Sequence, residues 1–283
     1  MQHLTGFAPL AAKFDGFVLD LWGVIHDGVT LYPGAAECLA RLHDTGKKAV
    51  LLSNAPRRGH VAQAGLRAMG LGDDLYHGIM TSGEASYILL RDRPDAWSRA
   101  LGDRVFHLGP QRDRSVIDGL DLVVVDRPED AGFVLNTGPD DIGGPTELAD
   151  WTDLLARCRH ARLPMLCANP DLEVIRGGVR LICAGALAEH YEAHGGDVRW
   201  IGKPDPAIYE PVLAMLALER SAVLAVGDAL RTDIAGAEAA GLASCWVLGG
   251  IHGAELGNDL ARIEAAPRHA ELSPLACVPA FSW

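Results

Sequence analysis

Short apolar runs alternate with helical patterns along nearly all of the 283 residues, and this alternation strongly limits the fold. Several runs, such as residues 16–21 and 222–227, are continuously apolar, which is typical of strands with helices on both faces of the sheet. Between the runs at residues 16–21 and 49–53, residues 33–46 begin with proline and end with glycine, which predicts a helix and hence a βαβ unit. Further runs that predict strands are 49–53, 122–126, 133–137, 164–168, 198–201 and 243–248. We therefore expect an α/β fold with a doubly wound parallel sheet.

The middle of the chain is expected to form a domain of its own. The chain is longer than a typical single domain, and residues 94–197 have their own strand and helix alternation after a loop-like stretch. We therefore expect a discontinuous core of residues 1–93 and 198–283 and an inserted α/β cap of residues 94–197. The apolar C-terminus would dock either on the core or on a partner subunit, so a homodimer remains open.

Composition excludes several classes of partner. Thirty-seven acidic and 25 basic residues give a formal net charge of −12, and no Lys/Arg-rich stripe interrupts it. Nucleic acids and anionic membranes would be repelled. The six cysteines form no CxxC pair, and neither a signal peptide nor a membrane-length apolar run is visible. These features predict buried free thiols and a soluble cytoplasmic protein.

Polar residues stand at or just after the ends of the predicted strands. They are Asp20, Ser53, Lys203 and Asp228, and Asp233 follows five residues after the last of them. Ligands of doubly wound sheets bind beyond the carboxyl ends of the strands, so these residues can meet despite their distance in sequence. Taken singly, each also has a structural explanation, since aspartates often end strands or cap helices and a lysine before proline is usually solvated.

The three aspartates together predict a metal site. Asp20, Asp228 and Asp233 would repel one another in a shared pocket without a cation, and oxygen ligands favour Mg²⁺ over zinc. Ser53 and the backbone amides around Asn54 could hold phosphate oxygens, and the cation with the nearby lysine would offset the phosphate charge. This combination predicts binding of a small phosphorylated metabolite.

At this point the chain resembles the haloacid-dehalogenase superfamily, and specifically its class IIA phosphatases, which act on sugar phosphates, nucleotides, p-nitrophenyl phosphate and pyridoxal phosphate. The motifs that carry the resemblance are Asp20 with Gly23-Val24, Pro33-Gly34-Ala35, Ser53-Asn54, Asn169-Pro170-Asp171, Gly202-Lys203-Pro204, and Gly227-Asp228 with Thr232-Asp233. The resemblance implies a Rossmann-like core with an inserted cap, Mg²⁺ as cofactor, and hydrolysis of a phosphomonoester through an aspartyl phosphate on Asp20.

Trp22 departs from the family pattern. The resemblance implies a second aspartate at this position, as general acid and base, whereas an indole cannot transfer a proton at physiological pH. Loss of general acid-base catalysis costs about 10²- to 10⁴-fold in rate. The backbone carbonyl of Trp22 can still bind the metal. His26 could supply the missing acid as a catalytic residue, whereas Asp27 is better explained by a tight turn with Gly28.

Two other functions follow from this departure. A catalytically impaired phosphate- and Mg²⁺-binding or regulatory protein would retain the fold and the metal. Metal-independent dehalogenation, which the resemblance associates with an aromatic residue at the position of Trp22, would leave Asp228 and Asp233 unexplained and is disfavoured. In the cap, Asn169 and Asp171 are expected to stabilise a loop, and contact with substrate is the less favoured alternative.

Overall fold

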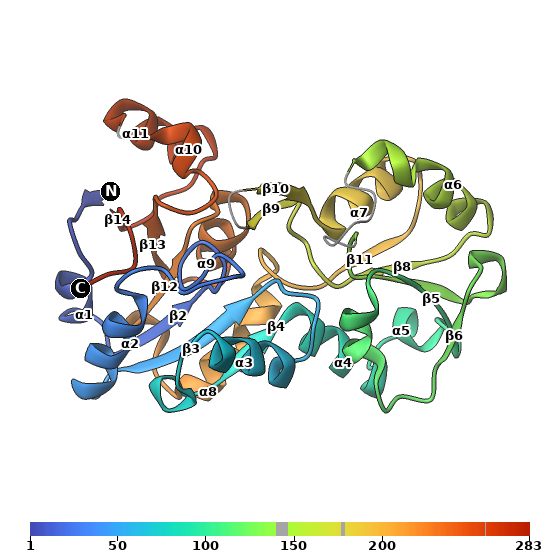
Figure 1. Ribbon diagram of the computed structural model, residues 1–283, viewed down its shortest axis with the longest axis horizontal. Coiled ribbons are helices and arrows are strands. Elements are labelled where there is room, and N and C mark those ends of the chain that lie inside the picture. The colour runs from blue at the N-terminus through green and yellow to red at the C-terminus, as the bar shows by residue number, and fades with distance from the viewer. Residues whose placement is uncertain (140–146, 177–178, 258) are drawn as a thin grey trace.

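The computed structural model describes residues 1–139, 147–176, 179–257 and 259–283, and it contains two separate parallel sheets (Figure 1). The larger one, the core sheet, has the order β1-β14-β13-β12-β2-β3-β4. Its strands are β1 Gln2–His3, β2 Gly16–Leu19, β3 Lys48–Ser53, β4 Ile79–Thr81, β12 Val223–Gly227, β13 Ala243–Val247 and β14 Ala276–Val278. From β2 the chain runs outward through β3 and β4, and from β12 it runs the other way. The predicted α/β fold is confirmed, and the switch point of the sheet lies between β2 and β12.

Helices cover both faces of the core sheet. Phe17 packs in a buried cluster with side chains of α1, α2 and α3, whereas its neighbour Val18 packs on the other face with α8 and α9. The helices are α1 Ala8–Ala11, α2 Ala35–Asp44, α3 Gly59–Ala68, α8 Tyr209–Leu216 and α9 Ala235–Ala239. This alternate burial of consecutive residues explains why the strand is apolar throughout.

The second sheet, the insert sheet, is also parallel and has the order β11-β8-β7-β5-β6. Its strands are β5 Arg104–Leu108, β6 Val123–Val125, β7 Phe133–Asn136, β8 Met165–Cys167 and β11 Val198–Trp200. The α-helices around it are α4 Ser82–Asp92, α5 Ala96–Arg99, α6 Thr152–His160 and α7 Ala184–Ala193. The boundary that we expected between residues 197 and 198 assigned β11 to the core, but this strand pairs with β8 in the insert sheet.

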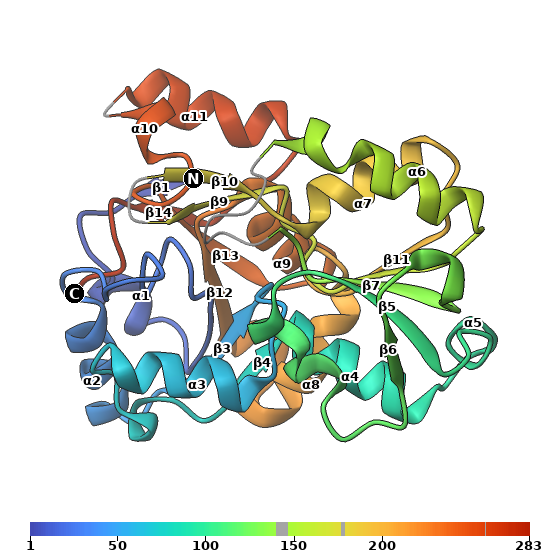
Figure 2. The same ribbon diagram turned by 45° about the vertical axis from the view of Figure 1, so that its right-hand side comes forward.

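An antiparallel hairpin lies between the two sheets in Figure 1, and in the turned view of Figure 2 it appears above the core strands. It consists of β9 Glu173–Arg176 and β10 Val179–Ile182. The hairpin leaves the insert sheet after β8 and extends over the carboxyl-terminal side of the core strands. This placement brings residues of the insert to the end of the core sheet where ligands are expected.

The C-terminus docks on the core of its own chain. After α10 Gly253–Leu256 and α11 Leu260–His269, β14 pairs in parallel with both β13 and β1. Phe281 is buried and packs edge-to-face on Phe7 at a ring-centroid distance of 4.8 Å. The apolar tail is therefore part of the core.

Short 3₁₀ and π-helical segments lie between the larger elements. The 3₁₀ segments are η1 Asp73–Leu75, η2 Gln111–Ile117, η3 Pro128–Asp130, η4 Leu148–Trp151, η5 Pro206–Ile208 and η6 Arg220–Ala222, and η7 Leu230–Ile234 is a π-helical turn. Among the described residues, no helix has the length and apolar character needed to cross a lipid bilayer.

Candidate active site

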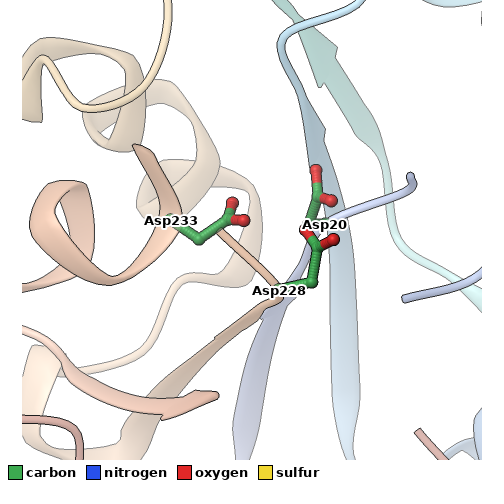
Figure 3. Close-up of side chains that lie close together, drawn as sticks. All are labelled: Asp20, Asp228 and Asp233. Atoms are coloured by element: carbon green, nitrogen blue, oxygen red, sulfur yellow. The ribbon is translucent and has the colours of Figure 1, made fainter. Parts of the chain in front are cut away.

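Three buried carboxylates converge at the switch point of the core sheet (Figure 3). Asp20 follows β2, Asp228 follows β12, and Asp233 lies in η7, one turn further along the chain. One oxygen from each carboxylate lies within 4.8 Å of the other two. The convergence follows from the parallel pairing of β2 with β12, which places the ends of both strands side by side.

The flap that follows β2 passes very close to this cluster. Gly23 has a φ of 76°, and a Cβ atom there would lie 2.0 Å from an oxygen of Asp228. Only glycine combines this backbone conformation with such close contact. Gly23 therefore has a physical reason to stand three residues after Asp20.

Lys203 places a positive charge between two of the carboxylates. Its Nζ donates to Asp20 Oδ1 and to Asp233 Oδ1, both at 2.6 Å, and to the carbonyl of Leu52 at 3.3 Å. Burial alone would lower the pKa of Lys203, but attraction to Asp20 and Asp233 outweighs burial and raises its pKa well above the usual value. The lysine is therefore charged, and it offsets part of the negative charge of the cluster.

The remaining negative charge fits a divalent cation. Burial raises the pKa of Asp228 to about 8, with repulsion from Asp233 as the next cause, and the backbone N–H of Ile251 donates to its Oδ2 at 2.6 Å. Burial also raises the pKa of Asp20, although Lys203 opposes the shift. Carboxylates with such unfavourable ionisation gain most from a nearby cation, and oxygen donors suit Mg²⁺. The residues present therefore fit the metal.

Ser53 and Asn54 end β3 beside the cluster but differ in position. Ser53 is buried and lines the cavity described below. The amide of Asn54 donates to the carbonyl of Lys203 at 3.1 Å and accepts from the backbone N–H of the same residue at 2.8 Å. It also accepts from Ser82 Oγ at 3.1 Å and donates to Asp171 Oδ1 at 2.9 Å. Asn54 thus joins the core to the insert. Among the described residues that line the cavity, Ser53 is included and Asn54 is not.

A cavity of about 470 Å³ opens from the carboxylate cluster. Its walls come from both sheets. The core contributes the residues of the cluster together with Trp22, Ser53 and Lys203, and the insert contributes Asp171 and the start of the hairpin, from Leu172 to Ile175. A ligand in this cavity would therefore contact the core and the insert at the same time.

The side chain of Trp22 occupies the flap at the edge of the cavity. Its indole lies against Gly28, where φ is 85° and a Cβ atom would lie 2.1 Å from the ring. The ring of His26 meets it edge-to-face at a centroid distance of 5.1 Å. Trp22 thus contributes an apolar surface at a position that the family resemblance gives to a carboxylate.

His26 and Asp27 serve the flap turn in this geometry. His26 is buried, its Nδ1 accepts from the backbone N–H of Gly28 at 2.9 Å, and burial lowers its pKa to about 4. Asp27 Oδ1 accepts from the backbone N–H groups of Val29 at 2.9 Å and Thr30 at 2.7 Å. Within the described residues, neither side chain lines the cavity. The structure therefore does not bring the side chain of His26 to the cavity.

The cavity is lined by further ionisable residues that sequence reasoning did not assign to catalysis, among them Asp171 and Arg231. Asp171 comes from the turn after β8, and Arg231 from η7. Arg231 also donates to the backbone carbonyl of Pro170, which ties η7 to that turn. The Asn-Pro-Asp element was a usable signal for Asp171, but nothing in the local sequence shows that this turn faces the core.

Known proteins share both the sequence patterns and the fold. A family model described as haloacid dehalogenase-like hydrolase matches residues 17–123, and one described as HAD-hydrolase-like matches residues 200–271. A crystal structure of a haloacid dehalogenase-like hydrolase from Brucella suis 1330 is 32% identical, with a TM-score of 0.84 over 98% of this chain and 99% of its own. Human chronophin is 28% identical over 88% of this chain and 87% of its own.

A solved structure of a glycerol phosphate phosphatase from Mycobacterium tuberculosis, in complex with calcium, is 27% identical with a TM-score of 0.62. The match covers 86% of this chain and 68% of that protein. Enzymes of this superfamily generally use Mg²⁺. The matches span both sheets and include the strand ends that carry Asp20 and Asp228. The chain therefore belongs to the haloacid dehalogenase-like hydrolases, and within them to the class IIA phosphatases.

Proposed function

We propose that this protein hydrolyses a small phosphomonoester in a Mg²⁺-dependent reaction, through an aspartyl phosphate on Asp20. The observation that carries the proposal is the position of Asp20, held between Lys203 and two further carboxylates at the base of a cavity. A nucleophilic carboxylate needs this setting, because its own charge and that of the phosphate must both be offset. The named phosphatases among the relatives support the same reaction class.

Each residue has a role in this proposal. Asp20, Asp228 and Asp233, with the carbonyl of Trp22, would hold Mg²⁺, which offsets negative charge on the phosphoryl group. Asp20 attacks phosphorus and releases the alcohol. Ser53 and the backbone amides around Asn54 bind phosphate oxygens, and Lys203 neutralises charge and holds Asp20 in place.

We also propose that residues 94–197, extended to include β11, act as a cap over the core. The hairpin supports this role, because the segment from Leu172 to Ile175 forms one wall of the cavity. A cavity of about 470 Å³ suits a small metabolite rather than a polymer. The chain's net negative charge points the same way, since it disfavours nucleic acid.

The second candidate function is phosphate and Mg²⁺ binding without significant turnover. It is favoured by Trp22, whose indole supplies no proton where the cavity opens. The residues that would hold Mg²⁺ and phosphate could still bind both without catalysing hydrolysis. The two functions differ only in whether the ester bond is broken.

A panel of phosphate esters, assayed with and without Mg²⁺, separates these functions. We expect p-nitrophenyl phosphate and small alkyl phosphates to be cleaved in the presence of Mg²⁺, and turnover to disappear in EDTA because the carboxylate charge is then no longer offset. Release of inorganic phosphate is the measurement. Binding of inorganic phosphate and Mg²⁺ without cleavage of any ester would instead establish the second function.

Calorimetric titration tests the metal ligands. Mg²⁺ should bind the parent protein with a measurable heat, and Asp228→Ala should remove that heat because the change deletes one of three converging carboxylates. Asp103→Ala, an aspartate exposed on the surface of the insert, is the matched control and should bind Mg²⁺ like the parent. Equal affinity of Asp228→Ala and the parent would show that the metal binds elsewhere.

A further inference from the structure

The turn that follows β8 brings a carboxylate of the insert into the active-site cavity. Asp171 lines this cavity together with Asp20 and Lys203. Its backbone is held in place, because its N–H donates to Asn169 Oδ1 at 3.0 Å and its carbonyl accepts from Gly185 at 3.0 Å. Asp171 is therefore positioned by the fold of the insert.

Its side chain is fixed on one side. Asp171 Oδ1 accepts from Asn54 Nδ2 at 2.9 Å, and among the described residues no hydrogen bond engages the other oxygen, Oδ2. The residue is partly exposed, and the surface that it exposes belongs to the cavity wall. A carboxyl group with one anchored oxygen and one unengaged oxygen suits exchange of a proton with a bound ligand.

A short series of contacts connects Asp171 to the nucleophile. Asn54 binds both Asp171 and the backbone of Lys203, and Lys203 in turn binds Asp20 at 2.6 Å. Asn54 also directly follows Ser53, which lines the same cavity. Asp171 therefore shares the cavity with the nucleophile and with Ser53, on the wall that the insert supplies.

The surroundings of Asp171 raise the pKa of its carboxyl group. Burial raises its pKa, against the opposing effects of Lys203 and of the hydrogen bond from Asn54. Asp233 adds to the upward shift of the pKa, and Arg231 opposes it. An ionised Asp171 would also repel a phosphate dianion, so substrate binding itself favours protonation of this carboxyl.

We propose that Asp171 is the general acid and base of the reaction, and that it supplies from the insert the proton transfer that Trp22 cannot perform. The inference deepens the proposed function and rests on it. Trp22 has no transferable proton, and His26 and Asp27 are used in the flap turn outside the cavity. Asp171 combines a titratable group with a position at the cavity.

The two chemical steps balance with this residue. In the first, an Asp20 oxygen bonds to phosphorus, the ester P–O bond breaks, and the carboxyl proton of Asp171 passes to the departing alkoxide, giving an alcohol. In the second, the Asp171 carboxylate takes a proton from a water molecule as the oxygen of that water attacks phosphorus. The bond between phosphorus and Asp20 then breaks, inorganic phosphate leaves, and Asp171 is again protonated.

The dependence of kcat/KM on the pKa of the leaving alcohol tests this role. The parent should show a shallow dependence, because the leaving oxygen is protonated as it departs. Asp171→Asn should lower kcat/KM for alkyl phosphates by about 10²- to 10⁴-fold and leave kcat/KM for p-nitrophenyl phosphate nearly unchanged, since that leaving group needs no proton. The kcat for every ester should fall, because the second step that they share loses its general base. A purely structural role of Asp171 would lower kcat/KM for all esters by a similar factor. Asp121→Asn, at an exposed position of the insert, controls for the substitution itself.

A double variant adds an independent readout. Trp22→Asp combined with Asp171→Asn should regain alkyl phosphatase activity, because a carboxyl returns to the flap. If Asp171→Asn lowers kcat/KM for all esters equally, or if His26→Gln and not Asp171→Asn steepens the dependence, the assignment of Asp171 is overturned while the phosphatase function stands. If the parent cleaves no ester at all, including p-nitrophenyl phosphate, the proposed function fails, and this inference fails with it.

Discussion

Replacing Asp20 with asparagine is expected to abolish turnover, with a loss of more than about 10³-fold in kcat on any phosphate ester. The amide is nearly isosteric with the carboxylate but is too weak a nucleophile to form the phosphoryl bond. The fold should remain, because the amide oxygen of the new side chain can still accept a hydrogen bond from Lys203. Phosphate release and the circular dichroism of the folded chain are the two measurements.

Asp15→Asn is the matched control for this change. Asp15 lies just before β2, is exposed, and pairs with Lys47 at 2.8 Å, so its substitution should leave kcat unchanged. Acid-quenched protein provides a second readout, since labelled phosphate should remain on the parent chain and be absent from Asp20→Asn. Turnover or labelling of the asparagine variant at the level of the parent would show that another residue is the nucleophile.

The second large effect concerns stability and is expected for Lys203→Met. Lys203 is buried and pairs with Asp20 and Asp233, so its loss leaves two buried carboxylates without their cation. Breaking a buried ion pair from one side typically costs about 3–5 kcal/mol, because the remaining charge is desolvated and uncompensated. We expect a decrease of this size in the free energy of unfolding, measured by urea denaturation at neutral pH in EDTA.

Two comparisons identify charge as the cause. Lys47→Met breaks the surface pair with Asp15 and should cost less than about 1 kcal/mol, since water screens that pair. Adding Asp233→Asn to Lys203→Met should recover part of the lost stability by removing one unpaired charge. If Lys203→Met and Lys47→Met are equally stable, the buried pairs contribute little to the folded state.

The strands that could be predicted from sequence are mostly those buried on both faces of the sheet, because most residues in them are apolar. Residues 16–21 and 222–227 were predicted as strands, and β2 and β12 occupy most of these ranges. The described strands that lie outside the predicted ranges are β1, β4, β5, β9, β10 and β14. β4 and β14 have three residues each, and β5 contains Arg104 and His107 within five residues. Such segments become strands through pairing with neighbours, a tertiary effect that no short window of sequence contains.

The site could be predicted to the extent that it lies at the ends of core strands. Asp20, Ser53 and Asp228 lie together as the parallel topology requires, because the ends of neighbouring strands in such a sheet share one edge. Lys203 follows β11 of the insert sheet, so its place at the site depends on how the two sheets pack. Asp171 could not be ranked in the same way, since its place at the cavity depends on how the insert packs over the core. The homodimer, the exact domain boundaries and the role of each site residue stay predictions.

The hairpin lets the residues that meet the substrate change independently of the catalytic carboxylates. Its first residues form one cavity wall but belong to a stretch of chain distant from Asp20, Asp228 and Asp233. Substitutions there can alter the shape and polarity that an incoming molecule meets without disturbing the carboxylates or the packing of the core sheet. Descendants of one ancestral hydrolase can therefore diverge in substrate specificity while they keep the same reaction.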